Sequence, residues 1–190
     1  EFGAKAVMTS KEHTCGTDRI SEVVNPLDVK VIVNIQADEP LIHPMMIDSV
    51  ARALLEDSSI NMVTLMKKIE DVVQVIDPNV VKVVVDKNNF ALYFSRASIP
   101  YLSPNAEIDQ VTYYKHIGLY GYTKDFLFIY KNLPAANLEK TEKLEQLRVL
   151  VEGFKIKVIE TKFDTVGVDT PEDLEMVKSQ LKKDKLNASG

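Results

Sequence analysis

The chain has 190 residues, which is long enough for one ordinary domain and short for two, so we expect a single domain over residues 1–190. Hydrophobic residues make up 45% and charged residues 27%, a balance typical of soluble globular proteins rather than disordered or fibrous ones. The formal net charge of -5 argues against nucleic-acid binding, and no apolar run is long enough to cross a bilayer, so we expect neither nucleic acid nor a membrane as a partner.

Cysteine usage indicates the compartment. The chain has one cysteine, Cys15, so no disulfide can form within it. The first residues are not followed by the apolar region of a signal peptide. We therefore expect a cytoplasmic protein.

Short apolar runs alternate with segments of helical spacing along the chain. The predicted strands, rich in Val and Ile and too short for helices, are residues 31–35, 62–66, 80–85 and 156–159. The residues expected to face a core are Met46, Ile47, Val50, Leu54 and Leu55 from one helix and Leu144, Leu147, Val151 and Phe154 from another. A last helix is predicted to begin at Thr170, with Pro171 in its first turn and Asp173 at the capping-box spacing.

This alternation predicts an α/β fold with a mixed, mostly parallel sheet flanked by helices. Residues 90–100 and 116–122 are more typical of strands in a small β-arm than of βα units. A nucleotide-binding domain of this class usually begins with a strand and a phosphate-binding loop. With 7 glycines and only the turn at residues 15–17 near the front, either the protein does not bind polyphosphate or the sequence is not the whole chain.

Two acidic segments follow predicted strands. Asp38 lies in the segment 36–40, which comes directly after the most hydrophobic strand, and Asp169 precedes the last helix. Ligands of open α/β sheets bind at the carboxyl ends of strands, and carboxylates are ligands that magnesium prefers, so the two aspartates predict a metal site. The alternative is that each segment only begins a helix or lies in solvent.

Further polar residues occur in hydrophobic surroundings. Arg96 can bind a carboxylate with two hydrogen bonds, while His116 and Tyr120, four apart on a strand and so on the same side, suit sugar hydroxyls. Gln146 lies at the edge of an apolar helix face. The alternatives are a core histidine, a packed tyrosine and a surface amide.

Taken together, these segments are similar to the 3-deoxy-manno-octulosonate (Kdo) cytidylyltransferase family. The matching segments are Met8-Thr9 with Gly16-Thr17-Asp18-Arg19, then residues 33–40, 79–84, 91–100, 116–122, 144–150 and 167–174. Ala37 stands where the family more often has glycine. The family's N-terminal segment, which carries the first strand and the Arg- and Lys-bearing phosphate loop, has no counterpart in the sequence.

The resemblance implies a nucleotide-diphospho-sugar transferase fold, Rossmann-like, and an enzyme that forms CMP-Kdo and pyrophosphate from CTP and Kdo for lipopolysaccharide biosynthesis. It implies a homodimer, with the β-arm at residues 93–100 as part of the interface. The implied roles are magnesium binding and catalysis for Asp38 and Asp169, Kdo binding for Gln36, Arg96, His116, Tyr120 and Gln146, and nucleotide binding for Gly16, Thr17, Arg19 and Ala37.

Two alternatives remain open from the sequence. The sugar could be another acidic sugar such as sialic acid. The chain could also be an inactive fragment, truncated at its N-terminal side, that only binds sugar or dimerises.

Overall fold

The computed structural model describes residues 3–13, 16–101, 111–165, 167–168 and 170–188, without the side chains of residues 182–188. Its strands are β1 (Val31–Asn34), β2 (Met62–Lys68), β3 (Lys82–Val85), β4 (Ala91–Ser95), β5 (Tyr114–Thr123) and β6 (Lys157–Glu160). Its helices are α1 (Gly16–Val24), α2 (Pro44–Glu56), α3 (Val72–Ile76), α4 (Lys124–Lys131), α5 (Asn137–Glu142), α6 (Leu147–Val151) and α7 (Pro171–Ala188). The four strands predicted from the apolar runs are confirmed to within two residues at each end.

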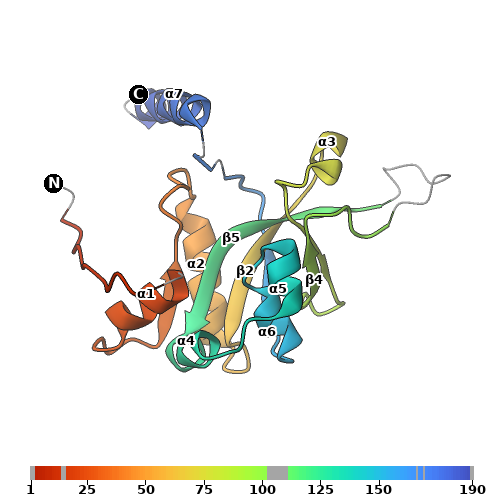
Figure 1. Cartoon of the computed structure of the whole chain (residues 1–190). Helices are drawn as coiled ribbons and strands as arrows, with labels where there is room; N and C mark the ends of the chain where they lie inside the picture. Colours follow the sequence, from red (N-terminus) through yellow and green to blue (C-terminus); the bar gives the residue numbers. More distant parts are fainter. Residues whose placement is uncertain (1–2, 14–15, 102–110, 166, 169, 189–190) are drawn as a thin grey trace.

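One sheet joins all six strands in the order β4-β3-β5-β2-β6, with β1 also paired to β5 (Figure 1). β1, β2 and β3 are antiparallel to β5, and β6 is parallel to β2, so these four strands run in one direction and β4 and β5 in the other. The expected mixed sheet is confirmed. Four of the six described strands run in the same direction, but β2 and β6 form the only parallel pair among them. The reason is that the antiparallel strand β5 separates β2 from β1 and β3.

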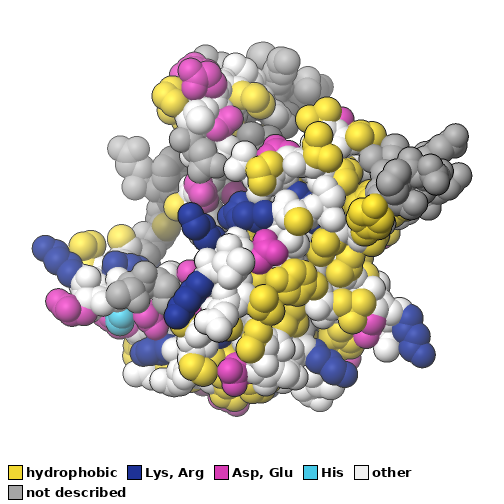
Figure 2. All heavy atoms as spheres, turned by 45° about the vertical axis from the view of Figure 1, so that its right-hand side comes forward, with side chains coloured by type: hydrophobic (Ala, Val, Ile, Leu, Met, Phe, Trp, Pro, Cys, Tyr) yellow, Lys and Arg dark blue, Asp and Glu magenta, His cyan; other side chains and the backbone are white. Residues whose placement is uncertain are grey.

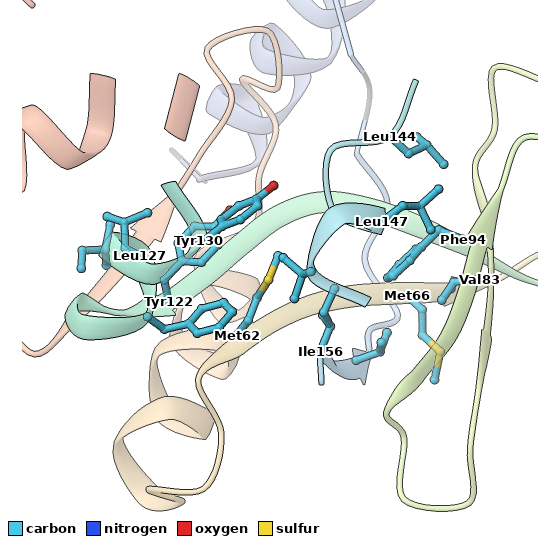
Figure 3. Packing of buried hydrophobic residues seen from close by; sticks show 14 of the residues in the cluster. Met62, Met66, Val83, Phe94, Tyr122, Leu127, Tyr130, Leu144, Leu147 and Ile156 are labelled. Carbon is cyan, nitrogen blue, oxygen red and sulfur yellow. The ribbon is translucent and has the colours of Figure 1, made fainter. Parts of the chain in front are cut away.

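Helices cover both faces of the sheet. On one face α2 packs Met46, Val50 and Leu54 against β2 and β5. On the other face, α1, α4 and α6 cover a larger core (Figure 3). In that core Tyr130 of α4 packs near Tyr122, and Leu147 of α6 lies near Phe94 (Figure 3).

The centre of the sheet contains a bulge that matters for the site. Thr64 of β2 pairs with Tyr120, whereas the next residue, Leu65, pairs with Ile117, so β5 carries two extra residues at this point. Side chains alternate along a strand with a period of two. Because two residues are added, His116 and Tyr120 remain on the same side of β5.

The expected helix across residues 144–154 is wrong. Lys143 adopts a left-handed conformation (φ 54°) that ends α5, and Gly153 (φ 80°) ends the chain's next short helix, α6. Val151 is half exposed, whereas Leu144 and Leu147 are buried and Phe154 packs against the same core, as expected. Leu55 of α2, also expected in a core, is 62% exposed.

The predicted start of the last helix is confirmed. The Asp173 amide donates to Thr170 Oγ1 (3.2 Å), and the Thr170 amide donates to the Asp173 carboxylate (2.9 Å), which is the reciprocal pairing of a capping box. The predicted β-arm is confirmed in part: residues 91–95 form β4, which pairs with β3 in an antiparallel hairpin, whereas residues 116–122 lie in β5 at the centre of the main sheet. Among the described residues, every helix is too short or too polar to cross a bilayer.

Candidate active site

A cavity of about 260 Å³ opens where β1 and β3 separate along one edge of β5. β1 ends at Asn34, opposite Tyr120, while β3 begins at Lys82, opposite Lys115, so none of the described strands lies beside the edge of β5 between these two positions. The cavity is lined by Gly16, Thr17, Asn34, Gln36, His116, Tyr120, Tyr122, Tyr130, Lys143, Leu144, Glu145 and Gln146. In Figure 3, Tyr122 and Tyr130 lie toward one end of β5 and Leu144 toward the other.

His116 and Tyr120 lie together in the cavity. Their ring centroids are 5.4 Å apart, and the His116 ring meets the Phe94 ring edge-on at 5.0 Å. Burial lowers the pKa of His116 from its ordinary value of 6.5 to about 3, so the imidazole is neutral at neutral pH. Burial also raises the pKa of Tyr120 well above its ordinary value. Both rings therefore act as neutral hydrogen-bonding groups.

Gln146 brings an unpaired donor to the opposite wall. Its side chain is 4% exposed, and its amide nitrogen is sealed from solvent without a hydrogen-bond partner among the described residues. A buried donor left without a partner costs about 1–3 kcal/mol. The surface-amide interpretation of Gln146 is therefore excluded.

The loop after β1 carries two adjacent carboxylates. Asp38 is exposed, whereas Glu39 is half-buried and its Oε2 atom is sealed without a partner among the described residues. Burial, and then the neighbouring Asp38, raise the pKa of the Glu39 carboxyl. Two oxygen-donor groups, one of them partnerless, fit the ligand chemistry of a hard divalent cation.

The two predicted acidic segments meet in space. The Val168 amide donates to the Asp38 carbonyl at 2.8 Å, which joins the loop after β1 to the residues just ahead of α7. Asp169 itself lies outside the described residues. Within the described residues, no group of three or more His, Cys, Asp or Glu side chains forms a metal cluster.

Arg96 lies at the end of β4 and does not line the cavity. Its Nε donates to the Glu142 carbonyl and its Nη1 to the Pro78 carbonyl, both at 2.9 Å. The Arg96 amide donates to the Glu142 carboxylate at 2.9 Å. Nη2 has no partner within the described part of the chain and stays available to an anion.

A buried lysine holds the same corner. Lys82 is fully buried, and its ammonium group donates to the carbonyls of Asp77 (2.7 Å), Val80 (2.5 Å) and Arg96 (2.8 Å). Burial lowers the Lys82 pKa, against the raising effect of nearby Asp77. Three carbonyls satisfy all three ammonium donors, so Lys82 has a structural role and fixes the backbone around Arg96.

The residues expected on the nucleotide side divide into two groups. Gly16 and Thr17 begin α1 and line the cavity. Arg19 instead donates to Thr9 Oγ1 (2.8 Å) and to the Ser10 carbonyl (3.1 Å), which ties the first segment of the chain to α1. Ala37 is exposed outside the cavity lining.

Sequence reasoning missed several residues of the cavity, namely Asn34, Tyr122, Tyr130, Lys143, Leu144 and Glu145. Tyr122 could have been found, because it continues the alternation of His116 and Tyr120 along β5. Lys143 and Glu145 are close in sequence to Gln146, but the left-handed turn that directs this segment leaves no clear pattern in the sequence.

Comparison with known proteins identifies the family of the chain. Residues 1–158 match the family model for cytidylyltransferases. The 3-deoxy-manno-octulosonate cytidylyltransferase of Solibacter usitatus is 47% identical over 189 residues, covering 100% of this chain and 74% of that protein. The enzyme of the same description from Geotalea uraniireducens is 49% identical over 190 residues, covering 96% of this chain and 76% of that protein.

Solved structures give the same result. A CMP:2-keto-3-deoxy-manno-octonic acid synthetase complexed with CTP superposes with a TM-score of 0.89 at 38% identity, over 96% of this chain and 74% of that one. A putative glucose-1-phosphate thymidylyltransferase from Bacillus anthracis, at 14% identity and a TM-score of 0.54, shares the fold alone. The chain therefore belongs to the 3-deoxy-manno-octulosonate cytidylyltransferase family, whose members are nucleotidyltransferases.

Proposed function

We propose that the chain forms CMP-Kdo and pyrophosphate from CTP and Kdo. The observation that carries the proposal is the cavity, because it gathers Gln36, His116, Tyr120 and Gln146 from three separate segments beside Gly16 and Thr17 of α1. These are six of the residues that the family resemblance implies for sugar and nucleotide. The anomeric hydroxyl oxygen of Kdo forms a bond to the α-phosphorus of CTP, the bond from that phosphorus to the bridging oxygen breaks, pyrophosphate leaves, and the hydroxyl proton passes to solvent.

The chain's own residues contribute by binding and orienting the reactants. Neutral His116 and Tyr120 and the Gln146 amide hydrogen-bond sugar hydroxyls, with Gln36 at the end of β1 completing this side of the cavity. Arg96 binds the Kdo carboxylate through Nη2. Catalysis of phosphoryl-type transfer depends mainly on positioning and electrostatics, so no protein nucleophile is required.

Magnesium is the proposed cofactor, with Asp38 and Asp169 as its protein ligands. One support is the backbone hydrogen bond from the Val168 amide to the Asp38 carbonyl, which brings the two acidic segments together. The other is the carboxylate oxygen of Glu39, next to Asp38 in the chain, that has no partner among the described residues. When bound, the cation would neutralise charge that develops on the phosphates.

On the nucleotide side, Gly16 and Thr17 at the start of α1 are proposed to contact CTP. Arg19 and Ala37 are not in the cavity lining, and we propose that Arg19 acts by holding the segment around Thr9 next to α1. A cytoplasmic location is also proposed, supported by the single cysteine.

A homodimer is proposed, with the β3–β4 arm and the neighbouring α3 at its interface. α3 exposes Val72, Val73 and Ile76 at 48%, 65% and 71%, and β4 exposes Leu92 at 62%. Figure 2 shows hydrophobic side chains gathered on the face that carries these elements. Large exposed apolar surfaces of this kind are typical of protein interfaces.

The test is Kdo-dependent release of pyrophosphate from CTP in the presence of magnesium. Release with Kdo and none with sialic acid is expected, and release with sialic acid alone would reassign the sugar. Calorimetric titration of Kdo in the same preparation separates catalysis from sugar binding. Binding without release would support the sugar-binding module instead. The absence of both binding and release would contradict the proposal.

A further inference from the structure

Thr64 is a buried hydroxyl in the middle of an apolar strand. It is fully buried, and its neighbours in β2 from Met62 to Met66 are all buried hydrophobic residues. Its Oγ1 lies 2.9 Å from His116 Nε2, 2.9 Å from the Leu119 carbonyl and 3.1 Å from the Ile117 carbonyl. Thr64 thus connects the bulge of β5 to the histidine of the cavity.

The number of protons decides the direction of these bonds. A hydroxyl has one proton to donate and two lone pairs that accept, whereas a carbonyl can only accept. If Thr64 donates to the Leu119 or Ile117 carbonyl, its lone pair is free to accept a proton from His116 Nε2–H. If it donates to Nε2 instead, neither carbonyl receives its proton, and buried acceptors without donors are costly. The first arrangement is therefore favoured.

This arrangement determines the tautomer of His116. A neutral imidazole has one protonated and one bare nitrogen, and the bond made by one nitrogen sets the state of the other. With the proton on Nε2, Nδ1 keeps its lone pair. Nδ1 has no hydrogen-bond partner among the described residues and is not one of the sealed polar atoms, so it is open to the cavity that the ring lines.

We propose that Thr64 is a positioning residue that holds His116 as a hydrogen-bond acceptor at Nδ1, so that the cavity selects an occupant with a hydroxyl at this point. This inference rests on the proposed function, in which the donor is a hydroxyl of Kdo. A hydroxyl can donate its proton to the Nδ1 lone pair, whereas a carbonyl or carboxylate oxygen cannot, so an acceptor at this point favours a hydroxyl.

The direct test is NMR of the imidazole nitrogens in the ligand-free protein. The chain has only three histidines, His13, His43 and His116, so comparison with His116→Gln assigns the signals. We expect His116 to be protonated at Nε2 and bare at Nδ1. A proton on Nδ1 would overturn the inference without bearing on the reaction itself, because the measurement needs no substrate.

Two variants then test the role of Thr64. Thr64→Val keeps the shape and removes the hydroxyl, and we expect a mixture of tautomers and a KM for Kdo about tenfold higher, with the KM for CTP unchanged. Thr64→Ser restores the hydroxyl and should restore both readouts. Should Thr64→Val not fold, the native spectrum and Thr64→Ser still decide, because loss of the Nε2–H state in Thr64→Ser would contradict the inference. An unchanged tautomer in a folded Thr64→Val protein would also contradict it.

Discussion

At the scale of single residues, burial sets the charge state and the hydrogen bonds of the side chains in and around the cavity. His116 and Tyr120 are kept neutral by their surroundings, and Lys82 gives all three of its donors to the backbone. Glu142 accepts from the Ser95 hydroxyl (2.7 Å) and the Arg96 amide. The chemistry of the site therefore depends on residues outside the cavity as much as on those that line it.

The low pKa of His116 predicts a pH dependence of folding. In the unfolded chain the pKa of His116 has its ordinary value of 6.5, whereas in the folded protein it is about 3. Its contribution to stability is fully present above pH 6.5 and is lost as the pH falls toward 3, at about 1.4 kcal/mol per pH unit. Urea unfolding between these pH values should show a slope that is smaller by that amount in His116→Gln. Equal slopes in the two proteins would contradict the low pKa.

Glu142 is expected to support sugar binding through Arg96. In Glu142→Gln, an NH2 group replaces one carboxylate oxygen, so the bond to the Arg96 amide is kept only if the bond to Ser95 reverses direction, and the negative charge that accepts both bonds is lost. We expect the KM for Kdo to rise about tenfold while the KM for CTP stays constant. The matched control is Glu152→Gln, an exposed acid after α6, which should behave as the unchanged protein. Equal kinetics in both variants would show that Glu142 does not position Arg96.

The proposed magnesium ligands give a third prediction. Asp38→Ala and Asp169→Ala should each lower turnover about a hundredfold or more, because the charge on the phosphates would no longer be offset. Thermal unfolding of Asp38→Ala should change little, since the side chain is exposed. Pyrophosphate release measured across a magnesium titration is the readout. Unchanged magnesium-dependent turnover would remove that aspartate from the metal site.

At the scale of elements, β5 organises the molecule. It pairs with β1, β2 and β3, carries His116 and Tyr120 toward the cavity, and presents Gly121 to α2 on the opposite face. The absence of a side chain at Gly121 lets α2 approach the sheet. A Cβ there would lie 2.8 Å from Leu54 Cδ1 and would also collide with Val50.

Gly121→Ala should therefore destabilise the protein by about 1–3 kcal/mol, which is the usual cost of overpacking a core. The control is Gly16→Ala, because a Cβ at Gly16 has no atom within 4 Å. Denaturant unfolding of both variants gives the comparison. A Gly121→Ala protein as stable as Gly16→Ala would mean that α2 can shift away from the sheet without cost.

At the scale of the whole molecule, the sequence predicted the strands and the start of α7 better than the turns and long-range contacts that join them. Continuous Val and Ile runs located the buried strands, and the capping pattern at Thr170 located the start of α7, because both signals are local. The helix expected across residues 144–154 was wrong because φ at Lys143 and Gly153 is set by the surrounding fold. Thr64 left no signal beyond a polar residue in an apolar strand, since its role depends on the bulge between Ile117 and Tyr120, which is far away in the sequence.

The candidate site could be predicted only in part, because some of its contacts join segments that are far apart in the sequence. The family resemblance named residues that the fold gathers in the cavity, such as His116 and Gln146. It did not indicate that Arg96 lies outside the cavity lining, held by Glu142 and Lys82, because those contacts join segments far apart in the sequence.

The proposed homodimer is tested at this scale as well. Ile76→Asp places a charge on the most exposed apolar residue of α3, and we expect it to shift the protein toward monomer in sedimentation velocity. Leu55→Asp is the matched control, because Leu55 is similarly exposed but lies on α2. A dimer that survives Ile76→Asp and dissociates in Leu55→Asp would place the interface elsewhere.

The two-residue bulge of β5 also limits how this protein can change over evolutionary time. Deleting or inserting one residue between Ile117 and Tyr120 would turn every later residue of the strand to the opposite face, moving Tyr120 toward α2 and placing Gly121 at the cavity. A change of two residues would keep both faces intact. A change of two residues therefore leaves the cavity side of β5 as it is, whereas a change of one residue has to be absorbed by a further bulge.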